Sequence, residues 1–156
     1  DKSIDYIFSE HMFEHLKLTE AVKMLKECRR VLKKNGVLRI TLPCFEFLQD
    51  LYQHPEEYTD YIHKATDSSI PEVNEILPGV YPPILVINNF YRDWGHQVIY
   101  DYKTLEMLLH KYGFTNIKRC QLYESEHRFL TNMEKHDQAT YKNLSKIEST
   151  VIEASC

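Results

Sequence analysis

The N-terminal part of the chain alternates between strand and helix patterns, and this order constrains the fold more than any other feature. Ile4 to Phe8 is a short apolar run between polar residues, which is typical of a buried parallel strand. Thr19 to Lys34 carries apolar residues at helical spacing, and Val37 to Leu42 is a second apolar run. Asn35 and Gly36 lie between them, and Asn tolerates the left-handed conformation that ends a helix. Two strands joined by a helix predict a parallel pair in an α/β sheet.

Polar side chains follow the first predicted strand at the point where it ends. Ser9, Glu10 and His11 come directly after the apolar run, and His15 lies four residues beyond His11. In open α/β sheets, ligands bind in the crevice outside the carboxyl ends of the strands. We therefore expect the chemistry of the protein at this end of the sheet.

Five segments of the chain form a recognisable series: Asp1–Ile7, His11–Leu16, Leu25–Gly36, His96–Phe114 and Ser149–Ala154. In this order and spacing they resemble the C-terminal half of the class I S-adenosylmethionine-dependent methyltransferases. The first resembles the lead-in to the fourth strand of that fold. The second and third resemble the segment after it and the following helix with its turn. The resemblance covers between half and two thirds of the chain.

The resemblance implies a Rossmann-like methyltransferase sheet, of which residues 1–156 would cover roughly the fourth strand to the last. The last strand would be antiparallel and inserted between the preceding two. The implied cofactor is S-adenosylmethionine, and the implied activity is methyl transfer to a small-molecule or saccharide-like acceptor. The family's glycine-rich cofactor turn has no counterpart, since Gly36, Gly79, Gly95 and Gly113 lie far from one another. We therefore expect a fragment that by itself binds the cofactor weakly or not at all.

The resemblance also assigns roles to polar and aromatic residues. Ser9, Glu10 and His11, at the strand end, would bind the cofactor. His11 and His96 would be the catalytic residues, with His96 approaching from the acceptor side. For each histidine the alternative is a structural hydrogen bond to a neighbouring loop. The residues expected to bind the acceptor are His15, Tyr91, Asp93, Trp94 and Tyr100.

A second interpretation of the strand end is a metal centre. His11 to His15 spells H-x-x-E-H, the zinc signature of inverted metallopeptidases. In that motif a helix presents both histidines on one face, and the glutamate is the general base. A third ligand lies further on, for which Glu72 or Glu75 would be candidates. The residues before His11 form a strand pattern, which would splay the two histidines apart. We therefore expect no metal site.

Composition excludes several classes of function. The net charge of -4 argues against nucleic-acid and membrane-surface partners, which need clustered Lys and Arg. No stretch approaches the ~20 apolar residues of a membrane span. The four cysteines are scattered without metal-ligand spacing, which suits reduced thiols in the cytoplasm. A non-catalytic half-domain is a further alternative, and an exposed first strand would favour a homodimer or pairing with a missing N-terminal half.

The middle of the chain lacks a regular pattern between residues 67 and 94. The residues that interrupt it are Pro71, Pro78, Gly79, Pro82 and Pro83. A stretch this long inside a compact domain is usually functional, and its apolar and aromatic content favours an ordered lid. We expect a substrate lid that is more mobile than the sheet.

Regular elements are predicted on both sides of this stretch. Two short helices are expected over residues 45–52 and 55–64. After the stretch, Asp101 is a candidate N-cap of a helix that Gly113 ends, and residues 116–122 have a strand pattern.

Overall fold

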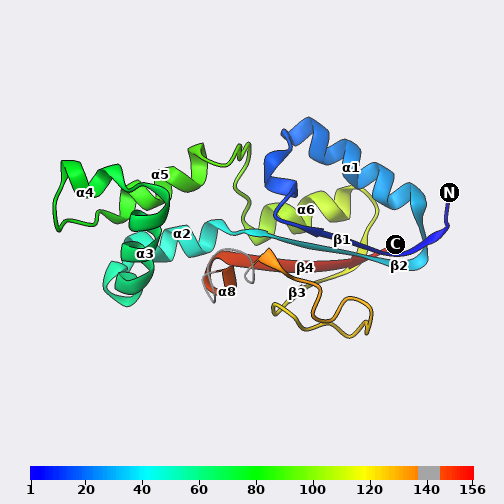
Figure 1. The fold of residues 1–156 in the computed structure, drawn as a ribbon. Helices are drawn as coiled ribbons and strands as arrows, with labels where there is room; N and C mark the ends of the chain where they lie inside the picture. Colours follow the sequence, from blue (N-terminus) through cyan, green and yellow to red (C-terminus); the bar gives the residue numbers. More distant parts are fainter. Residues whose placement is uncertain (137–144) are drawn as a thin grey trace.

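The computed structural model describes residues 1–136 and 145–156, and its centre is a four-stranded sheet (Figure 1). Helix α1 (Leu18–Val31) joins strand β1 (Ile4–Glu10) to strand β2 (Leu32–Pro43), and the two strands are parallel. The strand-helix-strand unit predicted at the N-terminus is therefore confirmed.

The last strand completes the sheet in the expected place. β4 (Ser149–Ser155) is antiparallel to both of its neighbours, which are β2 and β3 (Thr115–Cys120), and the strand order is β1-β2-β4-β3. The Rossmann-like fold is confirmed, including the insertion of the last strand between the preceding two.

The connection from α1 to β2 differs from the prediction. The helix ends at Val31, and not at Lys34, because Leu32 already has extended backbone angles and is fully buried against the core. Asn35 has a φ of 66°, so the left-handed turn predicted there is confirmed. The turn lies within a bulged part of β2, where the register against β1 shifts.

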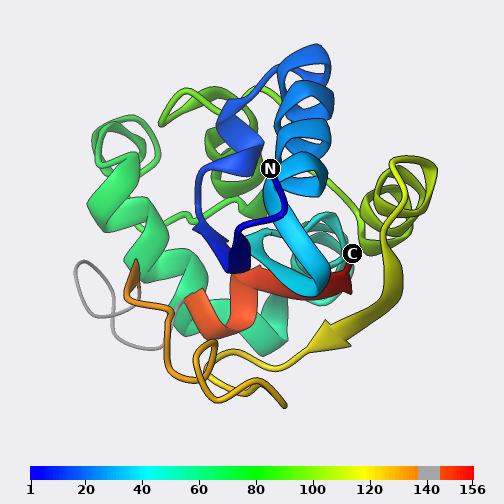
Figure 2. The same ribbon diagram turned by 90° about the vertical axis from the view of Figure 1, so that its right-hand side faces the viewer.

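The main core lies between the sheet and two helices. Leu38, Ile40 and Leu42 of β2 face α1 and α6 (Tyr102–Lys111), and all three are almost fully buried. Figure 2 shows the two helices together on one side of the sheet. This alternation of β2 side chains is the period of two expected of a strand.

Helix α6 begins and ends where the sequence predicts. The carboxylate of Asp101 accepts a hydrogen bond from the backbone N–H of Thr104 at 2.8 Å. Gly113 has a φ of 86°, and the N–H of the buried Phe114 donates to the carbonyl of Leu109 at 3.1 Å. Gly113 therefore ends the helix in the left-handed conformation, and Phe114 is the apolar residue that often follows such an end.

Residues 45–92 form a helical segment beyond the carboxyl ends of β1 and β2, in the left half of Figure 1. It has its own apolar core, built around Phe47, Leu51, Ile62 and Phe90. Its elements are α2 (Phe45–Gln53), the 3-10 helix η2 (Pro55–Tyr58), α3 (Thr59–Ser69), α4 (Glu72–Ile76) and α5 (Pro83–Arg92).

The expected loss of regular structure over residues 67–94 was wrong. α4 and α5 occupy much of this stretch, because Pro82 is the N-cap of α5 and Pro83 is its first residue. The fixed φ of proline fits the first turn of a helix, whose N–H groups lack helical acceptors in any case. Whether this segment moves as a lid stays a prediction.

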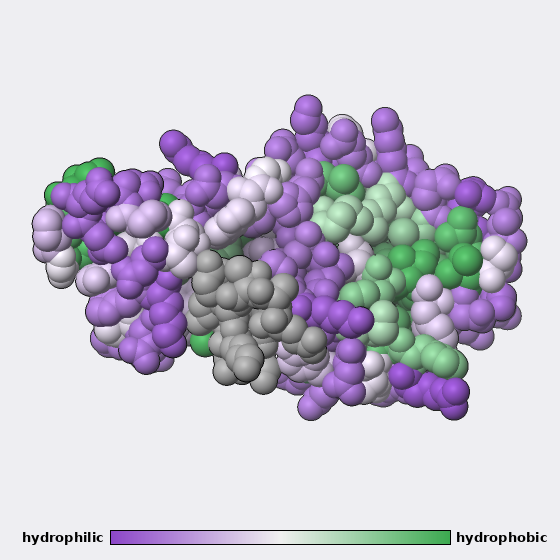
Figure 3. Space-filling view, in the orientation of Figure 1, coloured by the Kyte–Doolittle hydropathy of each residue, from purple (hydrophilic) through white to green (hydrophobic). Residues whose placement is uncertain are grey.

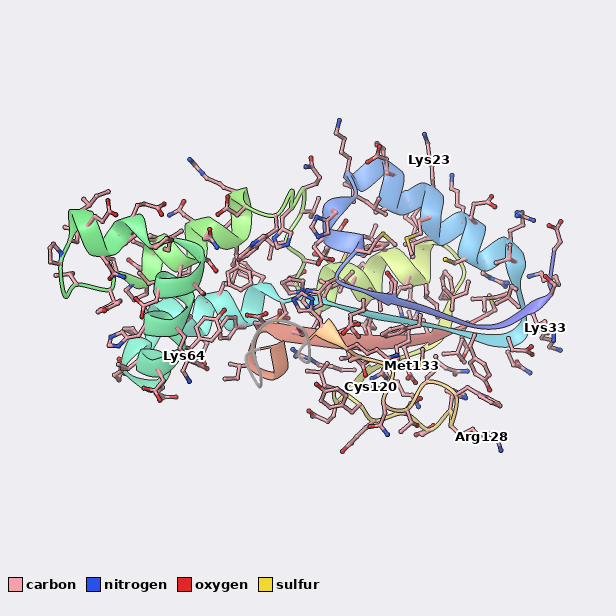
Figure 4. The ribbon with its side chains drawn as sticks, in the orientation of Figure 1. Lys23, Lys33, Lys64, Cys120, Arg128 and Met133 are labelled. Atoms are coloured by element: carbon pink, nitrogen blue, oxygen red, sulfur yellow. The ribbon has the colours of Figure 1, made fainter. Side chains whose placement is uncertain are left out.

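The second face of the sheet is covered by residues 121–136. Figure 4 shows Met133 below β2 and β4, with Arg128 at the outer tip of this segment. Arg39 of β2 anchors it from within the sheet, since its fully buried guanidinium donates to the carboxylates of Glu134 and Glu153, each at 2.7 Å. This arginine in the middle of a strand therefore holds residues 121–136 against the second face of the sheet.

β1 is the edge strand of the sheet within the described residues, and part of it is open to solvent. Ile4 and Tyr6 are exposed. Figure 3 shows apolar side chains gathered on the right-hand half of the molecule, on the face seen in Figure 1.

No helix in residues 1–136 or 145–156 has the length and apolar character needed to cross a membrane. The four cysteines are free thiols.

Candidate active site

A cavity of about 600 Å³ lies at the carboxyl ends of β1 and β2. Helices α3 and α5 form its opposite wall, with Ala65 and Ser68 from α3 and Asn89 and Phe90 from α5. The sequence-predicted residues that line it are Glu10, His11, His15, Trp94 and His96. The cavity therefore lies where parallel α/β sheets bind their ligands.

His11 is fixed at the strand end by backbone and side-chain contacts. Its N–H donates to the carbonyl of Thr41 at 2.9 Å, and its φ of 43° turns the chain away from the strand direction. Its Nε2 lies 3.2 Å from the hydroxyl of Ser149, and its ring stacks on His136 with centroids 3.9 Å apart. Both imidazoles border the cavity.

The two other residues predicted to bind the cofactor have different surroundings. The carboxylate of Glu10 borders the cavity but already accepts the backbone N–H groups of Lys135 and His136. Ser9 is buried in the sheet and is absent from the cavity lining, and its hydroxyl finds no hydrogen-bond partner in the described ranges. Glu10 and His11 thus reach the cavity, and Ser9 lies behind them.

Glu14, His15 and His96 meet at the inner end of the cavity. Glu14 is fully buried, and its Oε1 lies 3.8 Å from Nε2 of His15 and 3.5 Å from Nδ1 of His11. The rings of His15 and His96 meet edge to face, with centroids 4.8 Å apart. Residues 13–15 form a 3-10 turn in which Glu14 contacts both His11 and His15, but the group of possible metal ligands at this point contains His15 and not His11.

His96 is held in one orientation. Its Nδ1 lies 2.6 Å from the carbonyl oxygen of Phe90, and a carbonyl can only accept a hydrogen bond. The proton is therefore on Nδ1, and Nε2 of the neutral ring carries a free electron pair. Burial lowers the pKa of His96 from its ordinary value, which favours this neutral form.

The residues predicted to bind the acceptor do not all reach the cavity. His15 and Trp94 line it, and the indole of Trp94 packs on the rings of Phe90 and His96. Tyr91 and Asp93 are exposed at the end of α5 and are not part of the described lining. Tyr100 is a core residue packed on Phe13, and burial raises the pKa of its hydroxyl to about 12.

Several cavity residues carry no local sequence signal. Asn89 and Phe90 belong to α5, which was not predicted because prolines such as Pro82 and Pro83 usually interrupt regular structure. His136 lies in a polar segment that has neither a helix pattern nor a strand pattern. Glu14 was visible as the glutamate of the H-x-x-E-H motif, although its role was assigned to a peptidase base. Glu72 and Glu75, the candidate third metal ligands, are exposed on α4, and His96 takes their place beside Glu14.

Comparison with known proteins agrees with this geometry. The family model described as "Methyltransferase domain" matches residues 1–40, which include β1, the turn at Glu14 and His15, and most of the strand-helix-strand unit. Within residues 1–40 the chain is similar to a methyltransferase domain. The resemblance noted in the sequence implies S-adenosylmethionine as the cofactor of such a domain. No curated protein matches the chain in sequence.

Solved structures extend the similarity beyond the N-terminal segment. A SAM dependent methyltransferase from Archaeoglobus fulgidus has a TM-score of 0.53 and 16% identity, over 100% of this chain and 61% of that one. An S-adenosylmethionine dependent methyltransferase from Mesorhizobium loti has a TM-score of 0.50 and 12% identity, over 99% of this chain and 62% of that one. These structural similarities show the fold alone, and the chain spans about three fifths of the length of each of the two proteins.

Proposed function

We propose that the protein transfers a methyl group from S-adenosylmethionine to a small-molecule or saccharide-like acceptor. The observation that carries this proposal is the cavity at the carboxyl ends of β1 and β2, lined by His11, His15 and His96. Its volume of about 600 Å³ is within the range of small-molecule sites. The match of residues 1–40 to a methyltransferase domain supports the same reaction class.

The residues present fit part of the cofactor. The Glu10 carboxylate has four lone-pair positions, of which two backbone N–H groups leave at least one for an ammonium group. Its negative charge and that of the buried Glu14 favour a cationic ligand. When bound, S-adenosylmethionine supplies an electrophilic methyl group on a positively charged sulfur. Glu10 would hold it through its ammonium group, and His11 borders the same cavity.

The acceptor needs orientation, exclusion of water and, for a hydroxyl or protonated amine, removal of a proton. We assign proton removal to His11, because Glu14 lies 3.5 Å from its Nδ1 and would stabilise the imidazolium that forms. Trp94 and Phe90 provide an apolar wall for the acceptor, and His96 offers a polar contact beside them.

Transfer of tritium from S-[methyl-³H]adenosylmethionine to a panel of hydroxyl, amine and sugar acceptors tests this function. His11→Ala should lower turnover by about 10²–10⁴-fold, the usual contribution of a positioned acid or base. Its affinity for the cofactor, measured by calorimetry, should change little. His96→Ala should instead raise the Michaelis constant for the acceptor. His110→Ala, at an exposed site on α6, is the matched control. Equal turnover in the His11→Ala and His110→Ala variants would exclude His11 as the base.

A non-catalytic or partner-dependent role is the second candidate, and the exposed apolar residues of edge strand β1 favour it. Such an edge can pair with a second copy or with another polypeptide. We expect this chain alone to bind S-adenosylmethionine weakly or not at all, and a calorimetric titration that gives micromolar affinity would contradict this expectation. The free thiols suit a reducing compartment such as the cytoplasm.

A further inference from the structure

The buried carboxylate of Glu14 takes part in the proposed methyl transfer only while His11 is protonated. It is 0% exposed and lies on the 3-10 turn η1 (Phe13–His15). Neither of its oxygens accepts a hydrogen bond from any residue in 1–136 or 145–156, although both are inaccessible to solvent. A buried carboxylate without a partner is strongly unfavourable, whereas a bound cation compensates its charge.

Two imidazoles stand beside this carboxylate. Glu14, His15 and His96 each offer one ligand atom, and the three atoms lie within 4.8 Å of one another. Bond lengths of about 2.0–2.2 Å place the ligand atoms of a tetrahedral ion roughly 3.3 Å apart. The 3.8 Å between Glu14 Oε1 and His15 Nε2 is already near that separation. Small side-chain rotations would therefore close the three groups around one ion.

The orientation of His96 matches that of a metal ligand. Its Nδ1 donates to the carbonyl oxygen of Phe90 at 2.6 Å, which leaves the electron pair of Nε2 available. Metal-binding histidines almost always donate their other ring N–H to a carboxylate or a backbone carbonyl, which fixes the ring and raises its basicity. The Phe90 carbonyl is such a partner, and α5 supplies it from the far side of the cavity.

We propose that Glu14, His15 and His96 bind a divalent transition-metal ion of the Zn²⁺ type. Two imidazoles and one carboxylate suit such ions better than Mg²⁺ or Ca²⁺, which prefer oxygen ligands. Three protein ligands leave a coordination position open. Because all three residues line the cavity, that position faces it and would take water or a donor atom of the acceptor.

This site differs from the metallopeptidase that the motif suggested. Only His15 of the two motif histidines is a ligand, Glu14 is a ligand and not a general base, and the third ligand is His96. His11 stays next to the ion, with its Nδ1 3.5 Å from Glu14 Oε1. The sequence-based expectation of no metal is therefore replaced by this proposal.

Calorimetric titration of the tag-free protein with ZnCl₂ and with CoCl₂, together with elemental analysis, tests the site. We expect one ion per chain. Loss of a hydrogen-bond partner of a ligand alone commonly costs 10–100-fold in affinity. The variants Glu14→Gln, His15→Ala and His96→Ala should therefore each weaken binding by more than about 100-fold. His110→Ala should bind as the wild type does, because this histidine is exposed on α6.

Cobalt absorption provides a second measurement, since a three-ligand site gives visible bands that scattered surface histidines do not. Glu14→Gln keeps the side-chain volume and should fold, as judged by circular dichroism, while the bands disappear. If that variant fails to fold, the half-buried His96→Ala gives the same comparison. Absence of saturable binding, or binding that Glu14→Gln and His96→Ala leave unchanged, would overturn the proposal. Neither measurement uses S-adenosylmethionine, so a negative transfer assay leaves the metal result intact.

Discussion

Replacement of Arg39 by methionine is the most informative test of how this fold is held together. Methionine approximates the length of the arginine stem but donates no hydrogen bonds. The wild-type guanidinium is fully buried and contacts Glu134 and Glu153, which are each 1% exposed. It also donates to the carbonyl oxygens of Gln121 and Glu124, at 3.2 and 2.9 Å. Arg39→Met would thus leave two buried carboxylates without their cation.

The expected loss in the free energy of unfolding follows from the buried charge that Arg39→Met leaves unpaired. Removing one partner of a buried ion pair costs about 3–5 kcal/mol. The two carbonyl groups are only partly buried and can bind water, so they add little. A domain of this kind has about 5–15 kcal/mol of stability in total. With a urea dependence of about 2 kcal/mol per M, the midpoint of unfolding should fall by about 1.5–2.5 M.

Urea unfolding followed by circular dichroism at neutral pH measures this change. The matched control is Arg119→Met on strand β3 of the same sheet, where the exposed guanidinium lies over the ring of Tyr102 and should contribute at most about 1 kcal/mol. Adding Glu134→Gln and Glu153→Gln to Arg39→Met removes both unpaired charges and should recover more than half of the loss. A triple variant as unstable as the single one would refute the electrostatic explanation and favour lost packing.

Two further predictions concern the ends of helix α6. Gly113→Ala should destabilise the protein by about 1–2 kcal/mol in urea unfolding, because its φ of 86° is unfavourable for alanine and its Cβ would lie 3.3 Å from Nε of Arg29. Gly79→Ala, with a φ of 73° and no atom within 4 Å of its Cβ, is the control, and an equal loss there would exclude a contribution from Arg29. Asp101→Ala should cost about 1 kcal/mol at neutral pH. The hydrogen bonds from Thr104 hold the pKa of Asp101 below its usual range, so this contribution is present above the unfolded pKa. It should vanish as the pH falls below about 4, and a pH-independent difference would contradict the capping role.

Local features of the fold could be predicted because the residues concerned act on their own backbone. Asn35 takes the left-handed conformation wherever its neighbours lie, and Asp101 and Gly113 delimit α6 through bonds within a few residues. The period of the apolar residues similarly determined β1, α1 and β2. The end of α1 was misplaced because the burial of Leu32, a tertiary contact, overrode the helical period.

The candidate site was predicted in part. Its position at the carboxyl end of β1 follows from strand polarity, so Glu10, His11 and His15 were found from the sequence. The helix α5 was missed because Pro82 and Pro83 were interpreted as breakers, although proline at the start of a helix is favourable. Tyr100 was assigned to the acceptor site, but a tyrosine in an aromatic-rich segment gives no sign of whether it faces a core or a cavity.

Only the tertiary structure decided which distant side chains meet. Arg39 lies 95 residues from Glu134 and 114 from Glu153, and no periodicity links them. Glu14 and His96 are far apart in the sequence and meet because the chain returns after α5 to the strand end, where the backbone N–H groups of Gln97 and Val98 donate to the carbonyl of Glu14. A sequence pattern reports how a segment divides its own surface between core and solvent. Which partner a buried charge receives depends on how separate elements pack, and that is settled only when the whole chain is folded.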